Sequence, residues 1–394
     1  MMQQRSVYDV CIIGSGAGGG MAAYALTQAG ASVVMLEAGG MWDNTTSDSA
    51  MMRPNHTSPR RGAALPDRPF GEFDACIGGW TIEGEPYTRA EGSRFDWWRA
   101  RMLGGRTNHW GRISLRFGPD DFRRRSLDGL GDDWPISYDD VAPYYDRLDR
   151  LIGIFGTPEG LPNDPDGIFQ PAPVPRCYEL LVKKAADALD VRCIPARLSI
   201  LTEPLNGRAP CHYCGHCNRG CHTNSNFSST NVLIMPALET GRMTLITDAM
   251  AREVTLDAAG RADGVAYIDR TTGLDEHVRA RAVVLAASAL ESTRILLNSD
   301  MANSSGTLGR YLTDTTGTDV GGYAWPARAD DSVQDGVSFF NSFRDMTAAG
   351  FFSSRMGYED LGYIGNVWVD DWNGCPEPAL RKLGVSYDLM RRDA

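Results

Sequence analysis

Hydrophobic and polar positions follow a regular order near the start of the chain. Residues 7–13 form an apolar, β-prone run, and residues 32–36 form a second one. Between them, residues 21–28 have helical character and stop at Gly30. Short apolar runs bounded by glycine are typical of buried strands. The pattern therefore predicts a strand, a helix and a second strand.

Two segments farther along have the periodicity of amphipathic helices. Ser137, with Asp140 three positions later, has the form of a capping box at the start of the first helix. The second helix is predicted over "YELLVKKAADALD", residues 178–190. In the first helix, apolar side chains recur at helical spacing and predict a face buried in the core, at Val141, Tyr144, Tyr145, Leu148, Leu151 and Ile152.

Alternating positions predict further strands later in the chain. Residues 243–273 alternate as a strand, a hairpin and another strand do, with turn signals at Gly260 and Gly273. A buried strand is predicted at residues 283–286, followed by a turn of small residues and a helix that begins near Leu290. Strands and helices are thus mixed along the chain.

The length and charge of the chain narrow the class of protein. A chain of 394 residues indicates two domains or one elaborated α/β domain, and 42% hydrophobic residues suffice for a core. The formal net charge of −11 disfavours nucleic acid and anionic membranes as partners. No apolar run approaches the roughly 18 residues that a membrane-spanning helix needs. Because "MMQQRSVYDVCIIG" enters a strand almost at once, we expect no signal peptide in this chain.

A glycine motif joins the first predicted strand to the first helix. Gly14, Gly16 and Gly19 complete the pattern G-x-G-x-x-G, and Glu37 follows the second strand. In this pattern Gly14 permits a tight turn, Gly16 lets the backbone approach a pyrophosphate, and Gly19 lets the helix pack closely on the strand. The Glu37 carboxylate is placed to accept hydrogen bonds from the ribose hydroxyls of an adenosine. The whole unit predicts a dinucleotide-binding site.

A second glycine motif occurs in "RMLGGRTNHWGRISLRF", residues 101–117. The adjacent glycines Gly104 and Gly105 suit a backbone that packs against an extended ligand better than a simple chain reversal. The first glycine motif alone does not distinguish FAD from NAD. This second motif, with a later strand similar to that of a two-part FAD-binding domain, favours FAD.

Four of the nine cysteines lie in the segment "PCHYCGHCNRGC", residues 210–221, at Cys211, Cys214, Cys217 and Cys221. Their spacing, C-x2-C-x2-C-x3-C, equals that of the bacterial ferredoxin segment whose thiolates hold iron–sulfur clusters. Three ligands with a [3Fe–4S] cluster and four with a [4Fe–4S] cluster both fit. Zinc is one alternative, because His212, His216 and His222 lie in the same loop. Disulfides or thiols without a metal are another, and the remaining cysteines are interpreted as small apolar residues, Cys11, Cys76, Cys177, Cys193 and Cys375.

Together these segments resemble the glucose–methanol–choline (GMC) flavoprotein oxidoreductases, and in particular the flavoprotein subunits of membrane-associated sugar and gluconate dehydrogenases. The resemblance covers roughly residues 7–320. Besides the unit from Gly14 to Glu37 and the cysteine segment, it rests on "FDACIGGWTIEGEPYT" (73–88), "GGRTNHWG" (104–111), "DDWPISYDDVAPYYDRLDRLIGIFG" (132–156) and "VVLAASALESTRILLNS" (283–299).

The resemblance implies an α/β fold, with a Rossmann-like FAD-binding domain, an interleaved α+β substrate domain and a C-terminal truncation. We expect the FAD-binding domain in residues 1–150 and 230–320, a cysteine-rich insertion on the substrate side in 151–230, and a partial substrate domain in 320–394. Family members continue past this point, and their last part supplies the catalytic His with a second His or an Asn. No histidine follows His277 here, so the catalytic base stays unknown. Trp325, Trp368 and Trp372 could stack on a sugar ring, but we favour their interpretation as core residues.

The resemblance also implies roles for the second glycine motif. Gly104, Gly105, Arg106 and Thr107 would lie along the pyrophosphate and flavin, with Asn108 nearby. His109, followed by Trp110, is in a context in which some relatives join a histidine covalently to the flavin. A non-covalent contact with the flavin and a purely structural role are the alternatives for His109.

The implied activity is the oxidation of a CH–OH group of a sugar, sugar acid or alcohol by FAD. Electrons would leave through the iron–sulfur cluster to a cytochrome c subunit. Relatives work on the periplasmic side of the inner membrane, with a small subunit that carries the export signal, and a cytoplasmic enzyme is the alternative. Two other functions stay open, namely an inactive flavin-binding or electron-transfer protein and a structural subunit without cofactor.

Overall fold

The computed structural model describes residues 7–42, 78–79, 82, 84–89, 91–92, 95, 97–214, 217, 220–310, 312 and 377–390. The chain divides into two compact units. The first comprises Met1–Pro173, Ile194–Cys211 and His216–Thr313, and the second comprises Val174–Cys193, His212–Gly215 and Asp314–Ala394. Several residues considered in the sequence lie outside the described residues, namely Cys76, His216, Trp325, Trp368, Trp372 and Cys375.

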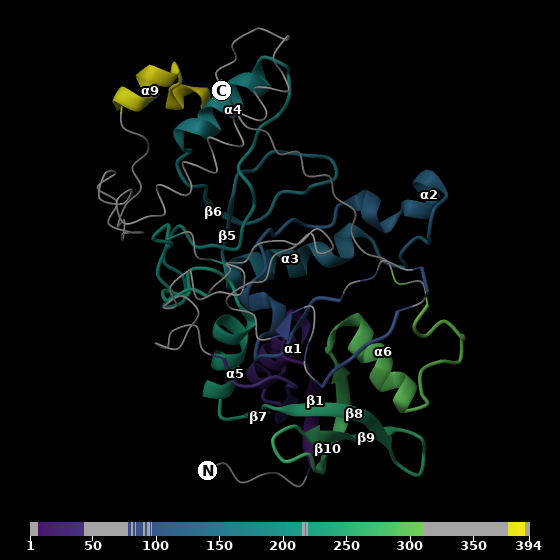
Figure 1. Cartoon of the computed structure of the whole chain (residues 1–394). Helices are drawn as coiled ribbons and strands as arrows, with labels where there is room; N and C mark the ends of the chain where they lie inside the picture. The colour runs from purple at the N-terminus through teal and green to yellow at the C-terminus, as the bar shows by residue number, and fades with distance from the viewer. Residues whose placement is uncertain are drawn as a thin grey trace. The chain divides into compact units, whose positions relative to one another are not determined.

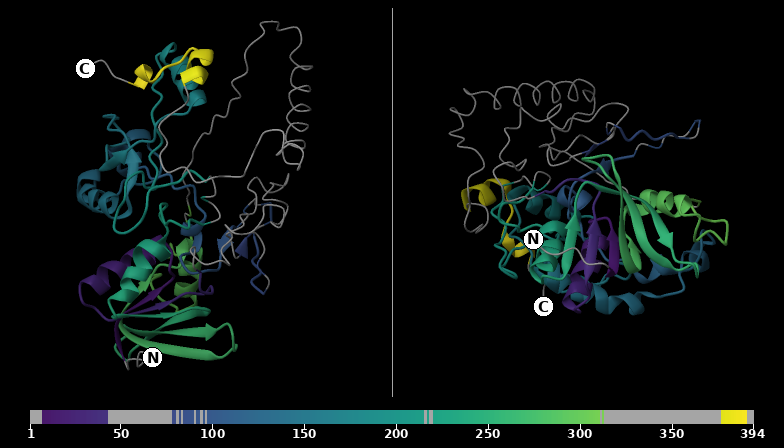
Figure 2. Two further views of the ribbon diagram at one scale, coloured as in Figure 1. Left: turned by 90° about the vertical axis from the view of Figure 1, so that its left-hand side faces the viewer. Right: turned by 90° about the horizontal axis from the view of Figure 1, so that it is seen from below.

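The first unit is built on a mixed six-stranded sheet with the order β7-β2-β1-β10-β9-β8 (Figure 1). Strands β7, β2, β1 and β10 run parallel, whereas β9 is antiparallel to both β10 and β8. The two further views in Figure 2 show these strands as one twisted layer. The strands are β1 (Tyr8–Ile13), β2 (Val33–Leu36), β7 (Met243–Ile246), β8 (Ala249–Leu256), β9 (Ala262–Asp269) and β10 (Asp275–Leu285).

Both faces of the parallel part of the sheet are buried. Alternate side chains of β1 point to opposite faces, so Cys11 and Ile13 join one core and Ile12 joins another. The first core includes Ile295 of helix α6 (Ser288–Asn298). The second core includes Ala23 of α1 (Ala17–Gln28) and Ala237 of α5 (Met235–Glu239). Burial on both faces explains why the parallel strands read as nearly continuous apolar runs.

The predicted strand, helix and strand at the start of the chain are confirmed as β1, α1 and β2. The helix begins at Ala17, earlier than the predicted Met21. The first turn was not predicted because its glycines have low helix propensity. Strand β10 is longer than the predicted strand over residues 283–286. Its first part pairs with β9, and most of the side chains there are exposed, so an apolar run does not mark it.

The capping-box prediction is confirmed in α3 (Tyr138–Ile152), where Asp140 accepts hydrogen bonds from the backbone N–H and hydroxyl of Ser137 at 2.7 and 2.8 Å. Tyr144 is 65% exposed, so its assignment to the buried face was wrong, while Ile152 is buried. The remaining elements of the first unit are β3 (Gly78–Gly79), β4 (Arg99–Ala100), η4 (Gly105–Asn108), η5 (Pro119–Phe122), α2 (Arg124–Asp128), β5 (Ile154–Gly156), β6 (Phe169–Pro171) and the π-helix η6 (Thr230–Ile234).

The second unit has a small core of its own. The predicted helix over residues 178–190 is confirmed as α4 (Cys177–Asp187), and its Leu180 packs with Leu380 and Val385. These two come from α9 (Glu377–Leu383) and the residues that lead to η8 (Tyr387–Met390).

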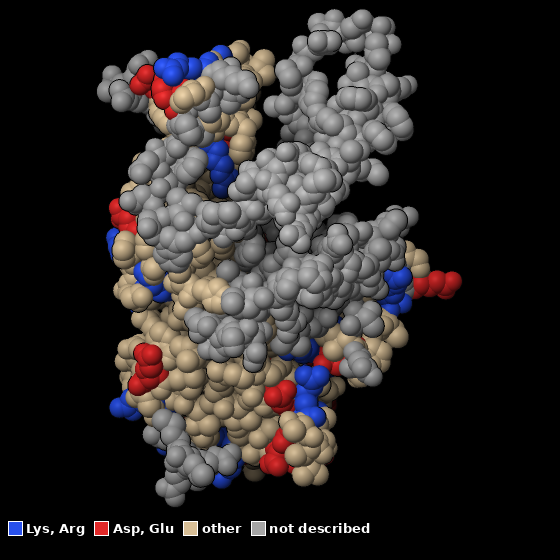
Figure 3. Space-filling model, turned by 60° about the vertical axis from the view of Figure 1, so that its left-hand side comes forward, with Lys and Arg blue, Asp and Glu red and all other residues tan. Residues whose placement is uncertain are grey.

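The α/β fold class is therefore confirmed, with a mixed sheet between helices. In the part of the chain that the structure describes, every helix is too short or too polar to cross a membrane. On the face shown in Figure 3, acidic and basic side chains lie beside one another over the coloured surface.

Candidate cofactor site and cysteine loop

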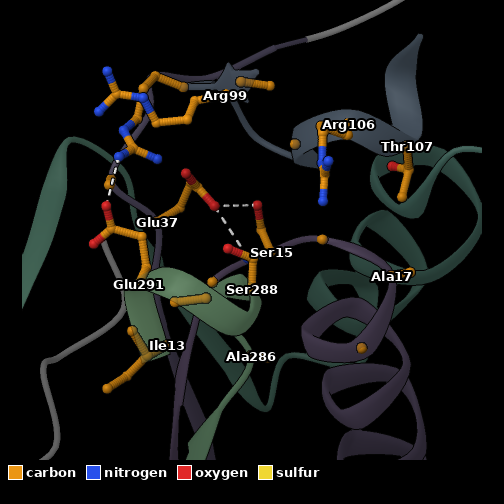
Figure 4. A pocket seen from close by; sticks show the side chains of 18 of the residues that line it. Ile13, Ser15, Ala17, Glu37, Arg99, Arg106, Thr107, Ala286, Ser288 and Glu291 are labelled. Carbon is orange, nitrogen blue, oxygen red and sulfur yellow. Dashed lines mark hydrogen bonds and ion pairs between the residues drawn. The ribbon is translucent and has the colours of Figure 1, made fainter. Parts of the chain in front are cut away.

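A cavity of about 440 Å³ lies in the first unit, where three parallel strands end (Figure 4). Ile13, Leu36 and Ala286, at the carboxyl ends of β1, β2 and β10, all line it. Such a crevice is the usual ligand site of an open α/β sheet. Its other walls come from the turn into α1, the segment Trp97–Arg101 and the helix η4. Both predicted glycine motifs thus contribute to one cavity.

The glycines of the first motif differ in what surrounds them. Gly14 has φ +94°, and a side chain there would meet the carbonyl oxygen of Ala286 at 2.5 Å. A side chain on Gly19 would collide with the carbonyl oxygen of Gly14. By contrast, a Cβ on Gly16 would meet no atom within 4 Å, and one on Gly105 would meet only the Cα of Gly16, at 3.9 Å. Gly14 and Gly19 therefore permit close packing, whereas Gly16 and Gly105 face open space.

Glu37 is a buried carboxylate at the end of β2 and is 7% exposed. One of its oxygens accepts hydrogen bonds from the backbone N–H of Ser15, at 3.0 Å, and from the Ser15 hydroxyl, as Figure 4 shows. The other accepts from the N–H of Gly39 at 2.7 Å. Burial raises the pKa of Glu37, and the hydrogen bonds from Ser15 and Gly39 oppose this effect. Sequence reasoning found Glu37 but missed Ser15, which is an unspecified position of the glycine motif.

Ser15 also connects the two glycine motifs, because its hydroxyl accepts a hydrogen bond from the N–H of Gly104 at 2.9 Å. A second connection runs through Ser229, which is fully buried. Its hydroxyl donates to the carbonyl of Ser15 at 2.8 Å, and its N–H donates to the Thr107 hydroxyl at 2.9 Å. No local pattern marked Ser229, since its partners are distant in the sequence. These bonds fix one wall of the cavity relative to the other.

The residues predicted from the second glycine motif separate into two groups. Gly105, Arg106 and Thr107 line the cavity. Gly104 and Asn108 lie behind them, and the Asn108 amide donates to the carbonyl of Leu103 at 2.8 Å. The left-handed backbone of Gly104, at φ +84°, makes the sharp turn into η4. The loop therefore contributes a glycine, an arginine and a threonine to the cavity wall.

His109 is 5% exposed and is not part of the cavity wall. Its ring lies edge-to-face against Trp98 at a centroid distance of 6.1 Å, and Trp98 does line the cavity. Burial, assisted by the charges of Arg112 and Arg106, lowers the pKa of His109 to about 4. The imidazole is therefore neutral at neutral pH and lies one side chain behind the cavity.

Ion pairs surround the opposite wall, near Glu37. Arg101 contacts Glu85 at 2.8 Å and Glu291 at 3.1 Å, and Glu85 also contacts Arg99 and Arg270. Burial lowers the pKa of Arg101, but hydrogen bonds and charge from Glu85 and Glu291 outweigh this effect, so its pKa is raised. Arg99, Arg101 and Glu291 line the cavity and were not predicted as site residues.

The cysteine segment begins beside Leu201, and the chain returns to Leu201 at Ser225, four residues after the segment ends. The N–H of Cys211 donates to the Leu201 carbonyl at 2.8 Å, and the N–H of Leu201 donates to the carbonyl of Ser225 at 2.9 Å. Cys211, Cys217 and Cys221 belong to the first unit, whereas Cys214 belongs to the second. Within the described ranges, no two cysteines form a disulfide, and no three His, Cys, Asp or Glu side chains are placed to hold a metal.

Two buried arginines accompany the cysteine segment in the first unit. Arg112 is fully buried and donates to the carbonyls of Asn108, at 2.9 Å, and Trp110. Arg208 is 8% exposed and donates to the carbonyl of Ile152. Burial lowers the pKa of each to about 10, and the Cys221 thiol opposes this in both cases. No carboxylate among the described residues pairs with either guanidinium, and no sequence signal distinguished them from other arginines.

Comparison with known proteins assigns the chain to a family. The GMC oxidoreductase family matches residues 17–316. The 6'''-hydroxyparomomycin C oxidase of Streptomyces lividus is 31% identical over 305 residues, which cover 74% of this chain and 50% of that protein. The 2-methyl-1,2-propanediol dehydrogenase of Mycolicibacterium austroafricanum is 32% identical over 317 residues, covering 77% and 54%. The fructose dehydrogenase large subunit of Gluconobacter japonicus is 27% identical over 414 residues, covering 98% and 72%.

The chain spans about half the length of the first two of these relatives. The family match nevertheless includes helix α1, the second glycine motif, the cysteine segment and strand β10. It therefore includes most of the residues that form the cavity. This chain belongs to the GMC oxidoreductase family.

Proposed function

We propose that this chain is the FAD-binding part of an enzyme that oxidises a CH–OH group of a sugar, sugar acid or alcohol. Membership of the GMC family implies FAD. The printed names of its relatives denote an oxidase of a hydroxyparomomycin, a dehydrogenase of a diol and a subunit of a fructose dehydrogenase. The observation that carries the proposal is the cavity into which both glycine motifs open.

The cavity walls fit the parts of FAD in chemical type. Gly16, Ala17 and Gly18 line the cavity at the start of α1, and no side chain caps this helix end. The first N–H groups of a helix lack acceptors within the helix, and they favour a pyrophosphate. Glu37 supplies carboxylate oxygens for ribose hydroxyls at the end of β2. Gly105, Arg106 and Thr107 would then lie along the flavin, with Gly104, Asn108 and His109 behind them.

FAD, when bound, supplies the hydride acceptor for the reaction. The residues of this chain bind and orient it through the α1 N–H groups, Glu37 and the loop that Ser15 and Ser229 hold in place. Neutral His109, with its pKa at about 4, would contact the flavin or form the covalent link to it. We assign no catalytic base to a described residue.

We further propose that Cys211, Cys214, Cys217 and Cys221 bind an iron–sulfur cluster through at least three of their thiolates. The ferredoxin-type spacing supports this assignment, and a flavin enzyme that serves a haem acceptor needs a one-electron relay. The proposal includes a cytochrome c partner and a small export subunit, on the periplasmic side of the inner membrane. The words "large subunit" in the name of the fructose dehydrogenase relative support an assembly of several chains.

The cofactor proposal is tested by filling the cavity. Val at Gly16 would occupy the open space beside the backbone, so Gly16→Val should remove the visible flavin absorption of the purified protein. Gly111→Val is the matched control, because Gly111 also has open space around it but is not part of the cavity wall. Wild-type protein that folds without FAD would contradict the proposal. Retention of yellow colour after acid precipitation, and its loss in His109→Ala, would support covalent attachment.

A further inference from the structure

The arginines that line the cavity differ in their partners. Arg99 forms an ion pair with Glu85, and Arg101 forms ion pairs with Glu85 and Glu291. Arg106 also lines the cavity, but its side chain is exposed and makes no hydrogen bond or ion pair with any residue that the structure describes. Carboxylates therefore already hold the first two guanidinium groups, whereas the guanidinium of Arg106 is free to contact a ligand.

The side chain of Arg106 extends across the cavity toward the first glycine motif. Figure 4 shows its guanidinium pointing from η4 toward the turn into α1, between Ser15 and Ala17. The two loops approach each other closely there, because a Cβ on Gly105 would lie 3.9 Å from the Cα of Gly16. The guanidinium of Arg106 thus faces the backbone at the start of α1.

The start of α1 is itself suited to an anion. The helix has no side-chain cap, and its first turn contains no acidic residue. Gly16, Ala17 and Gly18 line the cavity, and a Cβ on Gly16 or Gly18 would meet no atom within 4 Å. The N–H groups of a first turn lack acceptors within the helix and lie at the positive end of its dipole. A guanidinium and a helix N-terminus therefore face the same open space.

The charge of a pyrophosphate explains why the helix alone would not suffice. Each of its two phosphates carries negative charge, whereas a helix N-terminus offers the equivalent of about half an elementary charge. A guanidinium carries a full charge, and its planar N–H groups can donate two parallel hydrogen bonds to phosphate oxygens. Among the arginines that line the described cavity, Arg106 is the one without a carboxylate partner.

We propose that the Arg106 side chain binds the pyrophosphate of FAD from the side opposite the N–H groups of α1, and that it thereby gives the cavity its preference for ligands with a pyrophosphate. The inference rests on the FAD site of the proposed function. The backbone of η4 would lie along the flavin, while the Arg106 side chain extends back from it to the pyrophosphate. Because the side chain is exposed before FAD binds, this contact forms together with the complex.

The test compares ADP, which carries the pyrophosphate, with adenosine, which lacks it. Both are titrated calorimetrically into flavin-free protein of the complete chain, made in riboflavin-starved cells. Arg106→Met removes the charge, and Arg106→Lys keeps a charge without the planar N–H groups. Arg279→Met is the matched control, because Arg279 is likewise exposed and without a described side-chain partner but does not line the cavity.

Arg106→Met should weaken ADP binding about tenfold to a hundredfold and leave adenosine binding within about twofold of the wild type. Arg106→Lys should weaken ADP binding less than Arg106→Met does, and Arg279→Met should match the wild type for both ligands. Salt should weaken ADP binding more in the wild type than in Arg106→Met, because it screens an exposed charge.

Equal weakening of ADP and adenosine in Arg106→Met would indicate a structural role and overturn the inference alone. Unchanged ADP affinity with weaker FAD binding would place the guanidinium against the flavin, and it would also overturn the inference while the FAD site stands. Wild-type protein that binds neither ADP nor FAD would instead overturn the cofactor proposal and this inference with it.

Discussion

The cavity wall and the region beside the cysteine segment differ in how buried charged side chains are paired. At the cavity, Glu37 is surrounded by N–H and hydroxyl donors, and Arg101 lies between two carboxylates. Beside the cysteine segment, Arg112 is fully buried and Arg208 is 8% exposed, and among the described residues their side chains donate hydrogen bonds only to backbone carbonyls. In the first region, other groups of the protein therefore offset the buried charges of Glu37 and Arg101. In the second, no carboxylate among the described residues pairs with either guanidinium, so no ion pair there offsets the cost of burying the two charges.

The contrast between the two regions would be refuted most clearly if removing a paired arginine lowered the free energy of unfolding no more than removing an unpaired one. Arg101→Met leaves Glu85 and Glu291 without one cation, and it should lower the free energy of unfolding by about 3 kcal/mol or more. Arg208→Met in metal-free protein removes an arginine without a carboxylate partner among the described residues and its hydrogen bond to the Ile152 carbonyl, so it should lower the free energy of unfolding by no more than about 1 kcal/mol. Chemical denaturation of both variants measures the difference. Arg261→Met, which removes an exposed ion pair, is the control and should change stability by less than about 1 kcal/mol.

The burial of His109 behind the cavity predicts that the free energy of unfolding depends on pH. Its pKa of about 4 in the folded protein lies below the ordinary value of 6.5, so the unfolded chain binds a proton more readily between these values. Stability from this group is present above about pH 6.5 and is lost as the pH falls toward 4, by about 3 kcal/mol in total. His109→Gln should lack this component in urea titrations. An identical acid loss in wild type and variant would contradict the burial of a neutral His109.

Glu37→Gln tests whether the Glu37 carboxylate stabilises the cavity wall and binds FAD. The amide of Gln offers one acceptor oxygen and places its N–H₂ group against a donor, from either Ser15 or Gly39. The expected loss of stability is about 2 kcal/mol, with weaker FAD binding. Isothermal titration with FAD and denaturation of the flavin-free protein separate the two effects. Unchanged FAD affinity would exclude a role of Glu37 in holding the ribose.

The smallest expected effect concerns the link between the two glycine motifs. Ser229→Ala removes the hydroxyl that donates to the carbonyl of Ser15, and it should cost about 1 kcal/mol. Because the bond lies between the motifs, hydrogen exchange of the backbone near Gly104 should also become faster. Ser228→Ala is the neighbouring control, since Ser228 is also buried and its hydroxyl accepts a hydrogen bond from the N–H of Asn231 at 3.4 Å. Equal hydrogen exchange in both variants would show that Ser229 does not hold the two glycine motifs together.

The local pattern of the sequence predicted the first strand, helix and strand because burial on both sheet faces leaves a plain apolar signal in β1 and β2. It also identified residues on both sides of the cavity, since Gly16 and Gly105 mark backbone that needs open space. Ser229 and Arg99 escaped prediction because their roles come from contacts distant in the sequence. The lack of a carboxylate beside Arg112 and Arg208 among the described residues is likewise a property of the folded chain.

The most direct test of this account is the amount of flavin, iron, acid-labile sulfide and zinc in one preparation of the complete chain, purified without oxygen. The account predicts FAD together with about three or four irons per chain and matching sulfide. Gly16→Val should lose FAD and keep iron, and Cys217→Ser should lose iron and keep FAD. Wild-type protein that contains FAD with stoichiometric zinc and neither iron nor sulfide would contradict the electron-relaying cysteine segment.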